Sequence, residues 1–156
     1  YSMKFLKLPG GEKERHALMA AYERLTPFAD AAAALPQLKG VKRSILSVGT
    51  PDLLEKLVGN AGIADQFDKL FSVDAVKVYK PHPMTYQLAI DHFGVDRHEV
   101  GFVTSNFFDV AGARAFGFKV IWINRKGDLP DELGLLPHVE LSSIEQIPQV
   151  LGLRQA

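Results

Sequence analysis

Hydrophobic and polar positions divide the chain into two parts with different periods. In residues 12–25 apolar side chains recur at helical spacing, which predicts an amphipathic helix. A second helix is predicted from Asp30, a good N-cap residue, to Lys39, with Gly40 as its stop. A kink or break is expected at Pro36, because proline lacks the N–H of a helix interior. Residues 1–40 are therefore predicted to be mostly helical.

From Val41 onward, short apolar runs alternate with helical stretches. The predicted strands are residues 44–46, 70–73, 100–103 and 118–123, and the predicted helices start at Pro51, at Pro83, near Val110 and at Ser142. Such alternation is typical of a parallel sheet with right-handed crossovers and helices on both faces. We therefore predict an α/β fold with a Rossmann-like parallel sheet as its core domain, residues 41–156.

Composition narrows the function classes. The 156 residues are about one domain, and 18 basic residues balance 18 acidic ones. Binding to nucleic acid or to a membrane surface needs clustered positive charge, so this balance argues against both. The chain has no cysteine, which excludes disulfides, thiolate nucleophiles and cysteine-based zinc sites. No signal peptide or membrane-spanning stretch is visible, and we expect a cytoplasmic protein.

In a parallel α/β sheet, ligands bind beyond the carboxyl ends of the strands, where this chain carries polar turns. The turn Ser47-Val48-Gly49-Thr50 offers a hydroxyl and free backbone N–H groups at a helix start, which suits an anion or serves only as a cap. The next turn carries Lys80, stiffened by Pro81. Its ammonium would keep a nearby carboxylic acid ionised, unless it is a solvated surface lysine.

The third turn runs from Thr104 through Ser105 to Asp109. Asn106 has both a donor and an acceptor, Asp109 has acceptors when ionised, and their spacing of three places them on one helix face. They could equally cap the helix and complement its dipole. The aromatic residues 107 and 108 beside them suggest a dry pocket wall. Three such turns in order predict a functional site at one rim of the sheet.

These turns carry a family resemblance. The segments LSVGTPD (46–52), SVD (72–74), KPHP (80–83) and FVTSNFFDV (102–110), with Tyr86, resemble the L-2-haloacid dehalogenases of the haloacid dehalogenase superfamily. The resemblance implies a Rossmann-like sheet with a helical cap. It also implies hydrolytic removal of halide from a short L-2-haloacid, without metal or other cofactor. An aspartate attacks the halogen-bearing carbon, and water then hydrolyses the ester.

The resemblance also implies roles for single residues. Ser47 would bind the substrate carboxylate, and Lys80 would hold the nucleophile ionised. Asn106 and Asp109 would position Lys80 and the hydrolytic water. The implied substrate-binding positions are Ser47, Val48, Thr104, Ser105, Phe108, which would line the halide and alkyl pocket, and Tyr86, which would support the site.

The chain departs from the family pattern in three respects. Val48 stands where the family usually has an asparagine that helps to hold the departing halide, and Thr104 stands where it often has serine. The third departure is the nucleophile. No acid before Ser47 follows an apolar strand run, and these acids are Glu12, Glu14, Glu23 and Asp30. We therefore expect a core that lacks its first strand, with the nucleophile on a missing N-terminal segment or another chain, and residues 1–40 as a helical cap remnant and connecting helix. The resemblance also suggests a homodimer.

Two other functions compete with the dehalogenase. A superfamily phosphatase-like hydrolase would need acids around Mg²⁺, but Thr104-Ser105 replaces the Gly-Asp pair of that chemistry and leaves only Asp109. The other alternative is a catalytically inactive fragment or binding module with this fold. The histidines lack familiar ligand spacing, so we predict no metal site.

Overall fold

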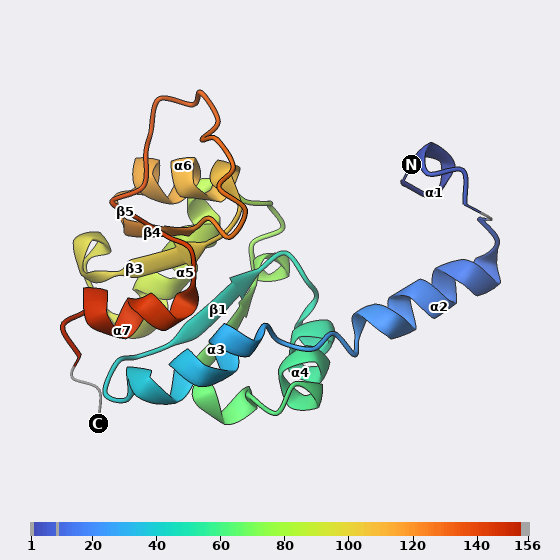
Figure 1. Ribbon diagram of the computed structural model, residues 1–156, viewed down its shortest axis with the longest axis horizontal. Helices are drawn as coiled ribbons and strands as arrows, with labels where there is room; N and C mark the ends of the chain where they lie inside the picture. Colours follow the sequence, from blue (N-terminus) through green and yellow to red (C-terminus); the bar gives the residue numbers. More distant parts are fainter. Residues whose placement is uncertain (1, 9, 154–156) are drawn as a thin grey trace.

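The computed structural model describes residues 2–8 and 10–153, which form a body of strands and helices with an N-terminal arm. The arm holds α1 (Ser2–Phe5) and α2 (Glu12–Tyr22), and Figure 1 shows it projecting away from the body. The strands of the body are β1 (Ser44–Ser47), β2 (Lys69–Ser72), β3 (Gly101–Thr104), β4 (Lys119–Ile123) and β5 (Val139–Leu141). The helices are α3 (Ala29–Ala34), α4 (Pro51–Asn60), α5 (Pro83–Phe93), α6 (Phe107–Phe116) and α7 (Ile147–Val150). Short 3-10 turns are η1 (Leu35–Leu38), η2 (Ala64–Gln66), η3 (Val73–Ala75), η4 (Arg97–Glu99) and η5 (Ile144–Gln146).

All strand pairs are parallel, and they form two separate sheets. β1 pairs with β2 so that Ser47 lies opposite Ser72, and the second sheet has the order β3-β4-β5. Within residues 2–8 and 10–153, no ladder joins β1 to β3. The predicted α/β fold with a parallel sheet is confirmed, as are all four predicted strands. β5 was not predicted, because three residues are too few for a period to be recognised.

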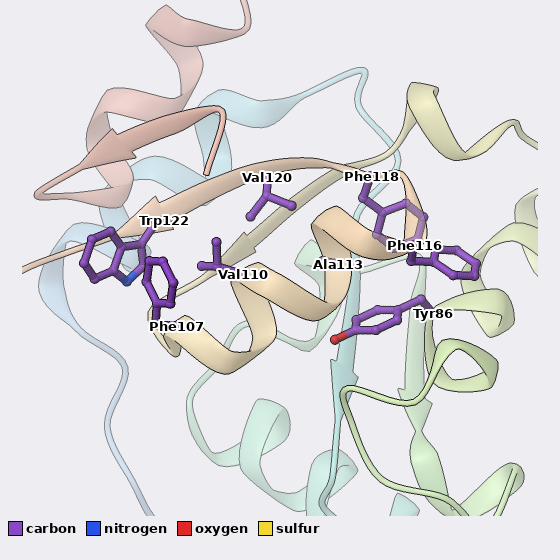
Figure 2. Close-up of a cluster of buried hydrophobic side chains, with 8 residues drawn as sticks. All are labelled: Tyr86, Phe107, Val110, Ala113, Phe116, Phe118, Val120 and Trp122. Carbon is purple, nitrogen blue, oxygen red and sulfur yellow. The ribbon is translucent and has the colours of Figure 1, made fainter. Parts of the chain in front are cut away.

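The near-continuous apolar run of β4 is explained by burial on both faces. Val120 and Trp122 point into a cluster with side chains of α5 and α6, which Figure 2 shows. Ile121 and Ile123 point the other way and pack with Leu38 of η1 and with α7. Successive side chains of a strand face opposite sides, so helices on both faces require apolar residues at positions 120–123 of β4, whereas Lys119 at its start is exposed.

Local sequence signals set several helix boundaries. The Thr50 hydroxyl accepts a hydrogen bond from the backbone N–H of Leu53, with Pro51 as the first residue of α4, as predicted. α6 ends at Gly117, whose φ of 106° is a left-handed conformation that glycine adopts without a Cβ clash. The predicted break at Pro36 is also confirmed, because α3 passes into η1 at Leu35.

Two helix predictions need correction. Asp30 is not the N-cap of α3, which starts one residue earlier, after Phe28. Its carboxylate instead accepts hydrogen bonds from Arg125, from the Ser143 hydroxyl and from the backbone N–H of Ile144. The helix predicted from Ser142 begins only at η5 and continues as the single turn α7.

The arm and α3 differ in packing. α2 ends at Tyr22, earlier than predicted, and has no buried residue, so its predicted apolar face is exposed. Its end is tied to α4, because Lys56 pairs with the Glu23 carboxylate at 2.9 Å and the Asn60 amide donates to the Glu23 carbonyl. By contrast, α3 and η1 bury Ala34 and Leu38 against the body. Nowhere in the part of the chain that the structure describes is a helix long and apolar enough to cross a membrane.

Candidate active site

The Lys80 ammonium links β1 of one sheet to α6, the helix that follows β3 of the other sheet. Its Nζ atom lies 2.6 Å from Oδ2 of Asp109, in the first turn of α6, and 3.2 Å from the carbonyl oxygen of Leu46 in β1. The Lys80 side chain is only 10% exposed and that of Asp109 is 1% exposed. The alternative of a solvated surface lysine is therefore wrong. An ammonium held this way supplies fixed positive charge at the rim of the sheets, where water screens it little.

Tyr86 completes the buried cluster. Its hydroxyl donates a hydrogen bond of 2.7 Å to Oδ1 of Asp109, so each oxygen of that carboxylate has its own donor. Burial raises the pKa of Tyr86 far above its ordinary value, and the hydrogen bond to Asp109 and the negative charge of that residue act in the same direction. Tyr86 is thus a permanent donor, because its phenol stays protonated over the whole physiological range.

The turn after β1 is held by a serine of the neighbouring strand. The Ser72 hydroxyl donates to the carbonyl oxygen of Gly49 at 2.6 Å and accepts from the backbone N–H of Asp74 at 3.1 Å. The Ser47 hydroxyl accepts from the backbone N–H of Gly49, also at 3.1 Å. The Val48 side chain is exposed. Sequence reasoning assigned no role to Ser72, although its place at the end of a predicted strand was a usable signal.

Residues of the turn after β3 bond mainly to their own backbone. The Thr104 hydroxyl accepts from the backbone N–H of Asn106 at 3.1 Å, and the Ser105 carbonyl accepts from the Trp122 indole N–H at 3.3 Å. Asn106 occupies the N-cap position of α6, but its side chain makes no capping hydrogen bond. Asn106 is exposed, and among the described residues no hydrogen bond joins it to Lys80.

The two phenylalanines that we interpreted as a pocket wall lie in different environments. Phe108 lines a surface cavity of about 510 Å³ together with Pro81, Gly112 and apolar residues of α6 and the 133–135 loop. Phe107 is buried in the core, with its ring edge-on to Trp122 at 5.0 Å, so its assignment to the wall was wrong. Side chains of neighbouring residues in a helix point in different directions, because successive residues are rotated by about 100° around the helix axis. The Lys80 ammonium does not line this cavity.

The other acids named from the sequence lie elsewhere. Glu12 pairs with Arg15, Glu23 with Lys56, and the Asp30 carboxylate with Arg125. Asp74 pairs with Lys77 on the surface. Across residues 2–8 and 10–153, no three His, Asp or Glu side chains gather as ligands for a metal ion. The structure thus brings Lys80, Asp109 and Tyr86 into direct contact, and it brings Ser47 close through the neighbouring Leu46 carbonyl.

Comparisons with known proteins show which family the chain resembles. The family model of haloacid dehalogenase-like hydrolases matches residues 5–117. An (S)-2-haloacid dehalogenase of Pseudomonas sp. (strain YL) is 41% identical over 152 residues, which are 96% of this chain and 66% of the relative. One of Xanthobacter autotrophicus is 49% identical over 125 residues, 80% of this chain and 49% of the relative. The chain therefore spans between half and two thirds of the length of these relatives.

A solved structure is similar over nearly the whole chain. The L-2-haloacid dehalogenase from Xanthobacter autotrophicus, with chloropropionic acid covalently bound, superposes with a TM-score of 0.91 at 36% identity, covering 97% of this chain and 71% of that one. The sequence matches and the structural similarity support the same family. This chain belongs to the haloacid dehalogenase-like hydrolases and is similar to the L-2-haloacid dehalogenases among them.

Proposed function

We propose that this protein hydrolyses the carbon–halogen bond of short L-2-haloacids through an aspartyl ester, with the nucleophilic aspartate on a segment outside these 156 residues. The observation that carries the proposal is the buried ammonium of Lys80, held between the Asp109 carboxylate and the Leu46 carbonyl. A similar protein with chloropropionic acid covalently bound supports a covalent intermediate.

The reaction takes place in two steps. A carboxylate oxygen attacks C2 of the haloacid from the side opposite the halogen, a C–O bond forms, and the halide leaves with the electron pair of the C–X bond. Water then attacks the carboxyl carbon of the ester and the bond from that carbon to the substrate oxygen breaks. One proton of the water passes to the departing oxygen of the 2-hydroxyacid and the other to solvent, so the nucleophilic carboxylate is regenerated. Because C2 is attacked once, its configuration inverts.

The residues of the chain divide the remaining tasks. Lys80 keeps the nucleophile ionised, since a nearby ammonium favours the charged form of a carboxylic acid. Asp109 and Tyr86 hold that ammonium in place, and Ser47 binds the substrate carboxylate. Asn106 orients the water. The substrate-binding surface is completed by Val48, Thr104, Ser105 and Phe108.

The two sheets suggest where the nucleophile enters. β1 and β3 are each paired on one side only within the described residues, and Lys80 spans from β1 to the helix after β3. Strand edges with unpaired N–H and C=O groups accept a further strand. We propose that a strand pairing between β1 and β3 ends beside Lys80 and brings the aspartate. In this proposal residues 41–156 are the core, residues 1–40 are a helical cap remnant with its connecting helix, and the assembled protein is a homodimer.

The test uses the full-length protein with L- and D-2-chloropropionate. We expect chloride release from the L isomer only, with the inverted 2-hydroxyacid as product, and incorporation of ¹⁸O from labelled water into the nucleophilic carboxylate during a single turnover. Lys80→Met retains the apolar length of the side chain without its charge and should abolish chloride release while the circular dichroism spectrum is retained. Retained turnover in Lys80→Met would remove Lys80 from the mechanism.

One observation distinguishes this proposal from a phosphatase-like function. The phosphatase alternative leaves Asp109 as its only acid in this region, and both oxygens of Asp109 are already bound by Lys80 and Tyr86. Metal-dependent hydrolysis would be lost on addition of a chelator. We expect chloride release to be unchanged by chelator, and its loss would contradict the proposed chemistry.

A further inference from the structure

We infer that Gly112 is a positioning residue for the Lys80–Asp109 ion pair, an inference that rests on the proposed function. A Cβ atom at this position would lie 2.4 Å from Cβ of Pro81 and 2.5 Å from the hydroxyl oxygen of Tyr86. Ordinary van der Waals contacts of a Cβ begin near 3.4 Å. The backbone of α6 therefore packs against the turn after Lys80 at a distance that only glycine permits.

The contact links the two partners of the ion pair. Gly112 lies one helical turn after Asp109, so both residues lie on the same face of α6. Pro81 directly follows Lys80, and Tyr86 is the second donor to Asp109. The distance between α6 and the side chains of Pro81 and Tyr86 therefore determines how close the Asp109 carboxylate lies to the Lys80 ammonium. Oδ2 of Asp109 and Nζ of Lys80 are 2.6 Å apart.

Glycine at position 112 lowers the stability of α6, and its close contacts with Pro81 and Tyr86 explain why no larger residue stands there. Glycine inside a helix is less stable than alanine by roughly 0.5–1 kcal/mol, because the unfolded chain has more conformations to lose. At Gly59, in α4, an added Cβ atom would have no neighbouring atom within 4 Å, so alanine would fit there freely. The two positions therefore form a matched pair. An added methyl group meets open space at Gly59 and contacts Pro81 and Tyr86 at Gly112.

We expect a methyl group at Gly112 to push α6 away from Pro81 by about 1 Å, the difference between the 2.4 Å available and an ordinary contact near 3.4 Å. Asp109 moves with the helix, and its bonds to Lys80 and Tyr86 lengthen together. A displacement of this size at an active site typically costs on the order of 10²-fold in rate. Ser47 lies at the end of β1 and not on α6, so we expect the binding of the substrate carboxylate to be affected less.

The experiment compares Gly112→Ala with Gly59→Ala in the full-length protein. For Gly112→Ala we expect kcat for halide release to fall on the order of 10²-fold, with a much smaller change in KM. A crystal structure should show a clear lengthening of the distance between Lys80 Nζ and Asp109 Oδ2, to beyond about 3.2 Å, the usual upper limit of a hydrogen bond. For Gly59→Ala we expect unchanged kcat and KM. A Gly112→Ala variant with wild-type kcat, or with the 2.6 Å ion pair intact, overturns the inference.

Two further arms keep the test decisive. If Gly112→Ala does not fold, the double variant Tyr86→Phe/Gly112→Ala, which removes the hydroxyl that would lie 2.5 Å from the added Cβ, is compared with Tyr86→Phe. The double variant should have a lower kcat through the displaced Pro81, and equal kcat values overturn the inference. If the wild-type protein releases no halide, the proposed function fails, and the ion-pair distance in the crystal structure of the Gly112→Ala variant alone decides the role of Gly112.

Discussion

Lys80 and Asp109 are 29 positions apart in the chain, yet they form an ion pair that is almost fully buried, with 2.6 Å between Nζ and Oδ2. Taking two charges out of water is costly, and the pair is maintained because Leu46 and Tyr86 satisfy further hydrogen-bonding groups. An arrangement of this cost is easier to understand at a catalytic site than as a source of stability.

Removal of the Asp109 carboxylate, which leaves a buried charge unpaired, should destabilise the fold strongly. Asp109→Ala leaves the Lys80 ammonium buried without its counter-charge and the Tyr86 hydroxyl without its acceptor, and we expect a loss of about 3–5 kcal/mol in the free energy of unfolding. Urea denaturation measures it. The double variant Lys80→Met/Asp109→Ala should recover part of the loss, because no unpaired charge remains. A loss below about 1 kcal/mol for Asp109→Ala would mean that the pair is solvated in solution.

The Ser72 hydroxyl should affect substrate binding through the turn that carries Ser47. Ser72→Ala removes the donor to the Gly49 carbonyl. We expect KM for L-2-chloropropionate to rise roughly five- to tenfold, corresponding to about 1 kcal/mol for one hydrogen bond, with kcat nearly unchanged. Ser72→Thr retains the hydroxyl and should restore KM. Steady-state kinetics on the full-length protein test this, and an unchanged KM in Ser72→Ala would exclude the role.

Val48 offers a gain-of-function test of halide handling. Its exposed side chain, 53% accessible, cannot donate a hydrogen bond, whereas the family usually has asparagine at this position. Val48→Asn should raise kcat/KM for L-2-chloropropionate about fivefold, the value of one additional hydrogen bond of about 1 kcal/mol. Val48→Leu, which adds bulk without a donor, is the control. No increase, or an equal increase in both variants, would contradict a hydrogen-bonding role at this position.

Asp30 should make the stability of the fold dependent on pH in the acid range. Partial burial is the largest single influence on this carboxyl and acts to raise its pKa. The hydrogen bonds from Ile144, Arg125 and Ser143 together outweigh it and lower the pKa below its ordinary value of 3.8. A lowered folded-state pKa means that the unfolded chain binds the proton more readily. The stabilisation is therefore complete above about pH 3.8 and is lost as pH falls through the folded-state pKa.

The matched variant for this prediction is Asp30→Asn, which is nearly isosteric and cannot ionise. At neutral pH it should be less stable than the wild type by about 1.5–3 kcal/mol, the range for hydrogen bonds to a charged group. The difference should shrink as the pH is lowered below 3.8. Urea unfolding at a series of pH values measures it, and a difference independent of pH would rule out ionised Asp30 as the stabilising species.

Structural features that depend on residues close together in the chain could be predicted from the sequence. The helix start at Pro51, the helix break at Pro36 and the apolar run of β4 all appear in the structure as predicted. Asp30 was assigned wrongly for the converse reason. Its side chain suits a local cap, but its partners lie 95 and more positions away, and the sequence carries no local trace of them.

The sequence by itself determined the alternation of strands and helices, and with it the rim at which Ser47, Lys80 and Asp109 follow their strands, because propensity, capping and period act over a few neighbouring residues. Only the tertiary structure decided which groups meet there. It joined Lys80 to Asp109 and to β1, left Asn106 exposed, and separated Phe107 from Phe108. It also revealed the close approach at Gly112. Such contacts depend on how whole elements seat against one another at sub-ångström precision, and no local pattern encodes that seating.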